Sequence, residues 1–196
     1  MAENTKKREQ TKKKLQDALM ALYNEYEFQK ITVSMLCKEA GMHRSTFYQY
    51  YSSTDELLRE IENNILKDIQ FYVGHVNDYD LSKTKQGLSP QEIYDLMAPE
   101  MVRFYTWQYS VRSYINPLLG AYGDPYFIQH YEDIIRDNMV PVVGMFHLKY
   151  EKQPYIMEYL VGGVIKTNKD WLSKGDVSIE ELVTIQRKML FNNPFA

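Results

Sequence analysis

The stretch ITVSMLCKEAGMHRSTFYQYYSSTDELL, residues 31–58, decides the fold of this chain. Its first third predicts a short helix that Thr32 or Ser34 caps, since both side chains are good acceptors at a helix N-terminus. Gly41 ends this helix, because glycine adopts the left-handed conformation that lets the chain turn sharply into a new helix. The apolar side chains of the first helix recur at helical spacing and mark its inward face: Val33, Leu36, Cys37 and Ala40.

Residues 43–51, HRSTFYQYY, predict the second helix. It turns Phe47 and Tyr51 toward the core, whereas aromatic and hydroxyl side chains crowd its outward face. Two short helices around a glycine turn, braced by a longer helix, form a helix-turn-helix unit. Simple helix packing explains Phe47 and Tyr51, but it does not explain the outward face.

The outward face of residues 43–50 has the size and the chemistry to enter the major groove of duplex DNA. Arg44 is the candidate for a bidentate contact with the O6/N7 edge of a guanine. The other outward residues supply shorter polar contacts, or hydroxyl contacts with phosphate oxygens. They are Ser45, Thr46 and Gln49 for the polar contacts, and Tyr48 and Tyr50 for the phosphates.

Helical spacing continues on both sides of this unit. Residues 5–26 predict a helix with basic first turns and one apolar stripe: Leu15, Ala18, Leu19, Leu22, Tyr23 and Tyr26. After Thr54 a long helix runs to about His75, with Leu57, Leu58, Ile61, Ile65 and Ile69 on its apolar face. The polar segment 77–88 that follows has turn character and predicts a loop.

Charge is distributed unevenly along the chain. The net charge is −3 and the isoelectric point is near 5.8, which gives no overall attraction to phosphate. Residues 1–54 nevertheless carry nine Lys/Arg against six Asp/Glu, so this part is +3 and the remainder is −6. A basic head on an acidic body suits DNA binding, because counterion release depends on the local basic surface. A Lys-rich N-terminus that is only a solvated tail explains the charge equally well.

The stretch 31–58 resembles the N-terminal signature of the TetR family of bacterial regulators. The pieces that carry the resemblance stand in register: Thr32-Val33, Ala40-Gly41, Thr46-Phe47-Tyr48, Tyr50-Tyr51 and Glu56-Leu57. The resemblance implies an all-helical homodimer that binds an operator in duplex DNA through a reading helix at residues 43–50. It also implies a lever helix behind the head and a variable effector-binding body.

The resemblance further implies which positions touch DNA. Carried over one by one, they are Ser34, Arg44, Ser45, Thr46, Tyr48, Gln49 and Tyr50. His43 and Thr54 complete the set of candidate DNA contacts. Two positions depart from the family pattern. Thr54 stands where the family usually has a lysine that touches the phosphate backbone, and Cys37 stands where a small alanine is common. The first departure is expected to weaken nonspecific affinity, and the second to adjust packing.

The body opens at Ser89-Pro90-Gln91-Glu92, a capping box with proline at the first helical position, and a helix follows to about Tyr105. Aromatic and methionine side chains then recur. They suit an adaptable pocket for a small hydrophobic or aromatic effector, and they suit an ordinary core as well. The pocket candidates are Tyr94, Met97, Met101, Tyr105, Trp107, Tyr114, Tyr126, Phe127 and Tyr131. Pro141 lies within the helical pattern of residues 125–150 and is expected to kink or break that helix.

Residues 155–172 and 179–191 predict two further helices, the second started by a capping box at Ser178 and Glu181. One apolar face and the pair Gly162-Gly163 suit a four-helix interface between two copies of the chain, although the hairpin can also pack only within its own subunit. The interface candidates are Ile156, Tyr159, Leu160, Gly163, Val164, Leu182, Ile185 and Met189. The segments VGGVI and KDWLSKG resemble the C-terminal region of a subgroup of these regulators from low-GC Gram-positive bacteria.

Catalysis, a metal site and a cofactor have no support in the sequence. The four histidines are scattered, the single cysteine excludes an internal disulfide, and no metal-ligand spacing, nucleophile elbow or phosphate loop is present. No apolar run approaches the roughly 20 residues of a membrane helix. A cytoplasmic protein that is not an enzyme is therefore expected.

Together these patterns predict an all-α protein in two parts. A three-helix helix-turn-helix head at 1–53 is joined by the lever helix to a helical-bundle domain for effector binding and dimerisation at 54–196. The expected function is repression at a pseudo-palindromic operator, controlled by a small molecule or a partner. The alternative is a coactivator or antagonist that acts through contact with another regulator, and the missing lysine at position 54 keeps this alternative open.

Overall fold

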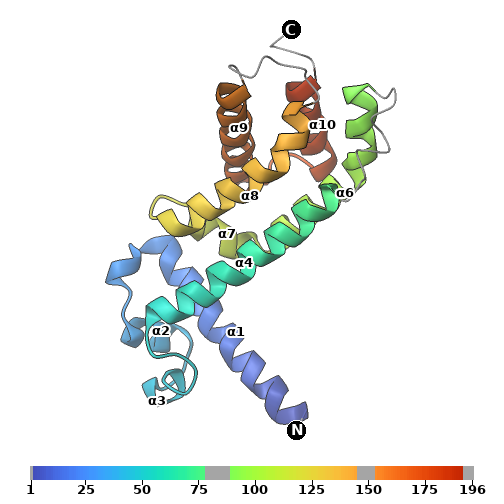
Figure 1. Ribbon diagram of the computed structural model, residues 1–196. Coiled ribbons are helices and arrows are strands. Elements are labelled where there is room, and N and C mark those ends of the chain that lie inside the picture. The colour runs from blue at the N-terminus through green and yellow to red at the C-terminus, as the bar shows by residue number, and fades with distance from the viewer. Residues whose placement is uncertain (1, 78–88, 145–152, 192–196) are drawn as a thin grey trace. The chain divides into compact units, whose positions relative to one another are not determined.

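The computed structural model describes residues 2–77, 89–144 and 153–191, and these residues contain helices and no strand (Figure 1). The predicted all-α class is confirmed. The predicted loop at 77–88 lies almost wholly outside the described residues, as do residues 145–150 of the expected helix at 125–150. The elements are α1 (Ala2–Glu25), the 3-10 turn η1 (Phe28–Lys30), α2 (Val33–Glu39), α3 (Arg44–Phe47), α4 (Thr54–Asn77), α6 (Pro90–Ser110), α7 (Arg112–Leu119), α8 (Pro125–Gly144), α9 (Gln153–Lys174) and α10 (Ile179–Phe191).

The chain forms two compact units, which are described separately. The head unit comprises Met1–Ile65 and Ser113–Phe127, and the body unit comprises Leu66–Arg112 and Ile128–Ala196. Helix α4 therefore contributes its first half to the head unit and its second half to the body unit. This division follows packing, and the functional boundary near residue 53 stays a prediction.

The apolar stripe of α1 forms one wall of the head core. Leu15, Ala18, Leu19 and Tyr23 are all buried, as the helical spacing predicts. Tyr26 is 42% exposed, so its assignment to the inward stripe is wrong. The physical reason is that α1 ends at Glu25, and the periodicity of the helix no longer sets the direction of the next side chain.

The local signals around the helix-turn-helix act as predicted at its start and at its turn. The Thr32 hydroxyl accepts a hydrogen bond from the backbone nitrogen of Met35 (3.2 Å) and caps α2. Gly41 has φ +64°, a left-handed conformation that side chains disfavour. The second helix is shorter than predicted, because α3 ends at Phe47 and residues 48–50 form a turn.

Helix α4 carries the long apolar stripe that its sequence predicts. Leu57, Leu58, Ile61, Ile65 and Ile69 are all buried. At its start the Ser53 hydroxyl accepts from the backbone nitrogen of Glu56 (3.2 Å), which satisfies one of the donors that a helix N-terminus leaves unpaired.

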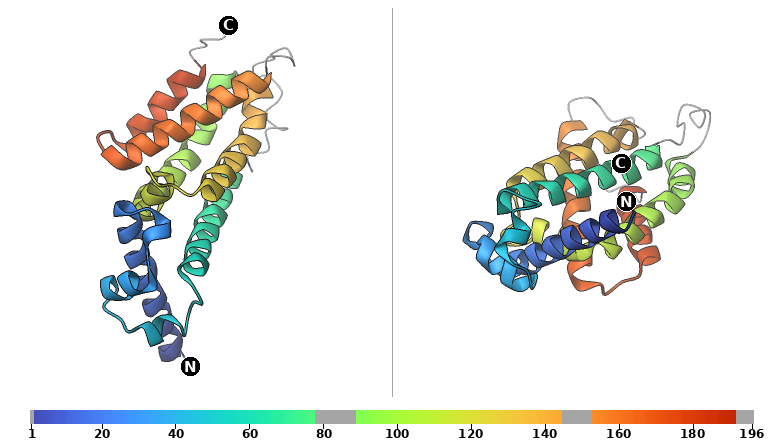
Figure 2. Two further views of the ribbon diagram at one scale, coloured as in Figure 1. Left: turned by 90° about the vertical axis from the view of Figure 1, so that its left-hand side faces the viewer. Right: turned by 90° about the horizontal axis from the view of Figure 1, so that it is seen from below.

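The body unit uses the predicted capping boxes. Ser89 and Glu92 exchange side-chain and backbone hydrogen bonds at the start of α6, and Ser178 and Glu181 do the same at α10. Helices α9 and α10 run antiparallel as a hairpin (Figure 2), and α10 also packs against α6. Helix α8 continues through Pro141 to Gly144, so the predicted break at that proline does not occur.

Candidate nucleic-acid interface

The structure gathers the predicted DNA contacts of residues 43–50 on one outward surface of the head unit. His43, Arg44, Ser45, Tyr48 and Gln49 are exposed. Exposure alternates sharply here, since the Tyr48 side chain is 58% exposed and that of its neighbour Phe47 is 0% exposed. Of the remaining candidates, Ser34 is exposed on α2, and three are half-buried: Thr46, Tyr50 and Thr54.

Phe47 fixes how α3 lies on the core. Its ring meets Tyr48 edge-on at 5.4 Å between centroids and lies tilted to Tyr51 at 5.9 Å. The carbonyl of Phe47 accepts from the backbone nitrogens of both Tyr50 (2.9 Å) and Tyr51 (3.0 Å). These tightened bonds end the helix, so Tyr48, Gln49 and Tyr50 lie in a turn that follows it.

Tyr51 links this surface to the helices on either side through Glu60 of α4. The Tyr51 hydroxyl donates to Glu60 Oε1 (2.8 Å), and Gln16 Nε2 of α1 donates to the same oxygen (3.1 Å). Lys12 Nζ pairs with Glu60 Oε2 at 2.6 Å. Burial alone would raise the pKa of Glu60, but hydrogen bonds from Lys12 and Tyr51 outweigh it and lower that pKa. One carboxylate thus braces three elements of the head.

The basic first turns of α1 also reach this surface, which the sequence reasoning did not foresee. The guanidinium of Arg8 lies 5.7 Å from the ring centroid of Tyr50, and the ammonium of Lys12 lies 5.2 Å from that of Tyr51. A signal was present, because Arg8 and Lys12 extend the buried stripe of Leu15 and Leu19 at spacings of three and four.

Cys37 lies in the core of the helix-turn-helix, as predicted, and is 3% exposed. Burial raises the pKa of its thiol, and the nearby charge of Arg44 offsets this only in part. A buried thiol with a raised pKa is a poor nucleophile. The departure from alanine at this position therefore adds packing volume and no reactivity.

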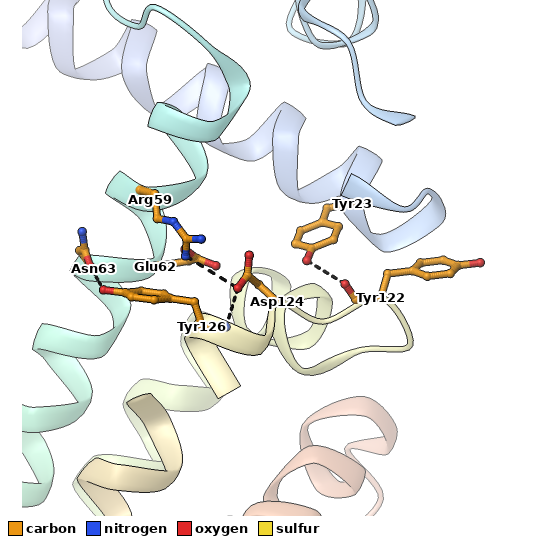
Figure 3. Close-up of polar contacts among 7 residues, drawn as sticks. All are labelled: Tyr23, Arg59, Glu62, Asn63, Tyr122, Asp124 and Tyr126. Carbon is orange, nitrogen blue, oxygen red and sulfur yellow. Dashed lines mark hydrogen bonds and ion pairs between the residues drawn. The ribbon is translucent and has the colours of Figure 1, made fainter. Parts of the chain in front are cut away.

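A charged cluster lies where residues 122–126 meet α4 within the head unit (Figure 3). Glu62 is 0% exposed, and its Oε2 accepts from Arg59 NH1 at 2.7 Å. The same guanidinium nitrogen lies 3.7 Å from Asp124 Oδ1 and the group stacks on the Tyr126 ring at 4.2 Å. Two carboxylates thus face a single cation.

Glu62 is the member of this cluster whose negative charge is least well compensated. Its Oε1 has no hydrogen-bond partner among the described residues. Burial, and then the charge of Asp124, raise the pKa of Glu62 to about 7. Burial and the same carboxylates also raise the pKa of Tyr23, whose hydroxyl donates to the carbonyl of Tyr122 (2.8 Å), to about 12. The connection between α7 and α8 is thereby tied to both α1 and α4.

Thr54 lies beside this cluster rather than on the open surface around Arg44. It lines a polar pocket of about 290 Å³ together with Asp55, Arg59 and Asp124. Thr54 adds no charge to a pocket that already holds two carboxylates and one guanidinium.

The predicted pocket residues fall in both units. Tyr114, Tyr126 and Phe127 belong to the head unit. There the Tyr114 hydroxyl contacts Lys13 and Asp17, and the guanidinium of Arg59 lies over the ring of Tyr126. The others belong to the body unit: Tyr94, Met97, Met101, Tyr105, Trp107 and Tyr131.

Two of the body residues belong to a buried polar chain. The Tyr105 hydroxyl donates to Gln186, whose Nε2 donates to Asn168 Oδ1 (3.1 Å). Asn168 Nδ2 and Gln108 Nε2 both donate to the hydroxyl of Tyr131, at 3.4 and 2.8 Å. Gln108 is 0% exposed, and its Oε1 has no partner within the described part of the chain. A buried acceptor without a donor is costly.

The predicted interface residues divide between the interior and the surface of one chain. Ile156, Leu160 and Leu182 are buried within the body unit. Val164 is half-buried, and the exposed candidates are Tyr159, Gly163, Ile185 and Met189. Apart from the neighbouring residues and the backbone of α9 itself, a Cβ added at Gly162 or Gly163 would meet no atom of the described residues within 4 Å. Across the described ranges no helix is long and apolar enough to cross a bilayer, and no group of three metal-binding side chains occurs.

The fold and this surface define a helix-turn-helix protein of the DNA-binding class. Residues 15–61 match the family model described as bacterial regulatory proteins, tetR family. No curated protein sequence matches the chain. Residues 15–61 therefore carry the N-terminal region of this family, as the sequence predicts.

Solved structures with a similar fold cover nearly the whole chain. A TetR transcriptional regulator from Streptococcus agalactiae 2603V shares 22% identity, covers 97% of this chain and 99% of its own, and gives a TM-score of 0.59. The dihydroxyacetone kinase operon activator DhaS shares 17% identity with coverages of 93% and 94% and a TM-score of 0.54. The repressor FadR of Thermus thermophilus, in complex with lauroyl-CoA, shares 17% identity with coverages of 94% and 95% and a TM-score of 0.50. At these identities the likeness shows a common fold.

Proposed function

We propose that two copies of this chain bind a pseudo-palindromic operator in the cytoplasm and repress transcription, and that a small molecule bound in residues 54–196 releases them. The contacts are assigned to the outward residues of 43–50, with Ser34 and Thr54 at the edges. Two copies related by a two-fold axis present their reading surfaces to successive major grooves, about 34 Å apart.

One observation carries this proposal. The side chains of His43, Arg44, Ser45 and Gln49 point outward from a short segment whose direction is fixed by the fully buried Phe47. The ring of Tyr48 is also exposed, although burial of such a ring would stabilise the fold. A rigidly held polar surface of this size is suited to reading base edges.

Arg44→Ala tests the assignment of the reading surface. The variant is expected to lose about 1–3 kcal/mol of binding free energy on the preferred operator, because it removes a bidentate contact with a base. It should also relax specificity at one base pair. The measurement is binding to genomic fragments over a range of salt concentrations, followed by the same titration on single-base variants of the fragment that binds best.

Arg103→Ala is the matched control. Arg103 is also an exposed arginine, but it belongs to the body unit and pairs with Glu100 on α6. Its removal should leave operator affinity unchanged. Equal, weak binding to all fragments, unaffected by Arg44→Ala, would instead favour a coactivator or antagonist that works through another regulator.

The buried polar chain of the body supports ligand control. Tyr105 lies against the rings of Phe104 and Trp171, and Tyr131 is fully buried. Gln108 offers an acceptor that no protein donor fills among the described residues. An apolar or aromatic compound with one hydroxyl or amide donor would satisfy that acceptor. We assign the effector to this chemical class.

Thermal unfolding tests the effector class. Aromatic alcohols and amides are screened, and a compound that binds the folded state is expected to raise the melting temperature in proportion to its occupancy. Gln108→Leu should reduce that rise for the same compound, whereas Thr106→Val, at an exposed position of α6, should leave it unchanged. Equal rises in both variants would place the ligand elsewhere.

The dimer interface is assigned to the exposed faces of α9 and α10. Tyr159 is 64% exposed and Met189 is 61% exposed, and the backbone at Gly162 and Gly163 is open to close approach by another helix. Large exposed apolar side chains beside small residues are typical of a helix–helix contact between subunits. Sedimentation of wild type and Met189→Glu tests this, with a dimer and a monomer as the expected results.

A further inference from the structure

Helix α1 projects well beyond the core that it supports. Leu15 is its first buried residue among those described, and the three turns before it are exposed or half-buried. These turns carry six cationic side chains and two carboxylates: Lys6, Lys7, Arg8, Lys12, Lys13 and Lys14 against Glu3 and Glu9.

Two of the cations in this segment are already paired with carboxylates. Lys12 is paired with Glu60 at 2.6 Å, and Lys13 with Asp17 at 2.6 Å. Arg8 is exposed, and within the described ranges it makes no ion pair. Its contact is the ring of Tyr50, at 5.7 Å from the centroid.

The position of Arg8 gives it a specific chemistry. A guanidinium that lies over an aromatic ring keeps its planar edge of N–H donors available, and that edge matches two phosphate oxygens at once. The same ring also restricts the rotamers of the long side chain, so that less entropy is lost when a phosphate binds. Tyr50 itself borders the surface assigned to DNA, with its side chain half-buried.

We propose that Arg8 binds a backbone phosphate of the operator, bidentately, beside the reading surface. This inference rests on the proposed DNA-binding function. It adds a second contact region, on α1, to the one formed by α2 and α3. The contact reads no bases, so it adds affinity and register and no sequence preference.

The salt dependence of binding measures this contact directly. Arg8→Gln is compared with wild type on a duplex that carries the operator and on a scrambled duplex of equal length. Each phosphate contact contributes about 0.9 to the slope of log affinity against log salt, so a dimer should lose about 1.8. Between 50 and 200 mM salt the ratio of wild-type to variant affinity should therefore shrink about tenfold, equally on both duplexes.

Two variants on the same helix serve as controls. Arg8→Lys keeps the charge but not the planar edge, so it should keep the slope and lose part of the affinity. Lys13→Gln removes another exposed cation, whose charge is already paired with Asp17, and it should leave the slope unchanged. An unchanged melting temperature shows that the variants are folded.

The outcomes separate this inference from the proposed function. If Arg44→Ala relaxes specificity while Arg8→Gln leaves the salt slope unchanged, the function stands and the α1 contact is refuted. A fall in slope that is equal for Arg8→Gln and Lys13→Gln also refutes it, because general charge then explains the effect. If wild type prefers no fragment and shows no salt dependence, the proposed function itself is refuted.

Discussion

Phe47→Ala is expected to destabilise the head by about 3–5 kcal/mol, since it removes a fully buried ring and leaves a cavity that the two flanking rings cannot fill. A loss of this size is a large part of the total stability of a small domain. The turn that presents Tyr48, Gln49 and Tyr50 is held in place by Phe47. The affinity for the operator should therefore decrease in this variant.

Hydrogen exchange measures this loss where it occurs. The amides of Tyr50 and Tyr51 donate to the carbonyl of Phe47, and they should lose protection in the variant. The tryptophans Trp107 and Trp171 lie in the body unit, and their fluorescence reports that unit separately. Gln49→Ala, an exposed neighbour, is the control and should change protection little. Unchanged exchange in Phe47→Ala would show that α3 is held by something other than this ring.

Glu62→Gln is expected to stabilise the protein by about 3 kcal/mol at pH 8, because it removes a charge that the folded state buries at a cost. The pKa of Glu62 is raised from an ordinary 4.5 to about 7 in the folded state, first by burial and then by Asp124. The folded state therefore binds this proton more tightly than the unfolded state does. Stability falls as pH rises from about 4.5 to 7, and the whole penalty remains above that range.

The measurement is chemical denaturation of wild type and Glu62→Gln at a series of pH values. The two curves should separate between pH 4.5 and 7 and then run parallel. Arg59, Asp124 and Tyr23 all face this group, and the variant leaves each of them in place. Glu56→Gln, on the same helix, is the control. Hydrogen bonds from Ser52 lower the pKa of Glu56, so its contribution is lost only at lower pH and the upper window is unaffected. Parallel curves throughout would show that Glu62 is solvated.

Local patterns carried most of what the sequence predicts about this fold. The left-handed Gly41, the caps at Thr32 and Ser89, and the burial of Phe47 and Tyr51 each depend on residues within a turn or two. Such features are legible because neighbouring side chains alone decide them. The helical spacing of α4 was confirmed for the same reason.

Contacts between distant residues were not predictable in this way. Lys12 and Glu60 are 48 positions apart, and no sequence pattern around either residue indicates that they pair. Glu62 stands three residues after Arg59 and reads as an ordinary exposed pair, yet packing takes it out of water. The sequence predicts a longer α3 because the inward Phe47 and Tyr51 are four residues apart, as in a continuing helix, whereas the bonds to the Phe47 carbonyl end the helix at that residue.

The single cysteine of this chain sits in the middle of the head, where Cys37 is shielded by the same packing that holds the reading surface. An alkylating reagent can reach this sulfur only when the helix-turn-helix opens. The rate at which one mass increment appears therefore counts those openings, without any added label. Bound operator that holds the head closed would lower this alkylation rate, and a ligand in the body that loosens the head would raise it.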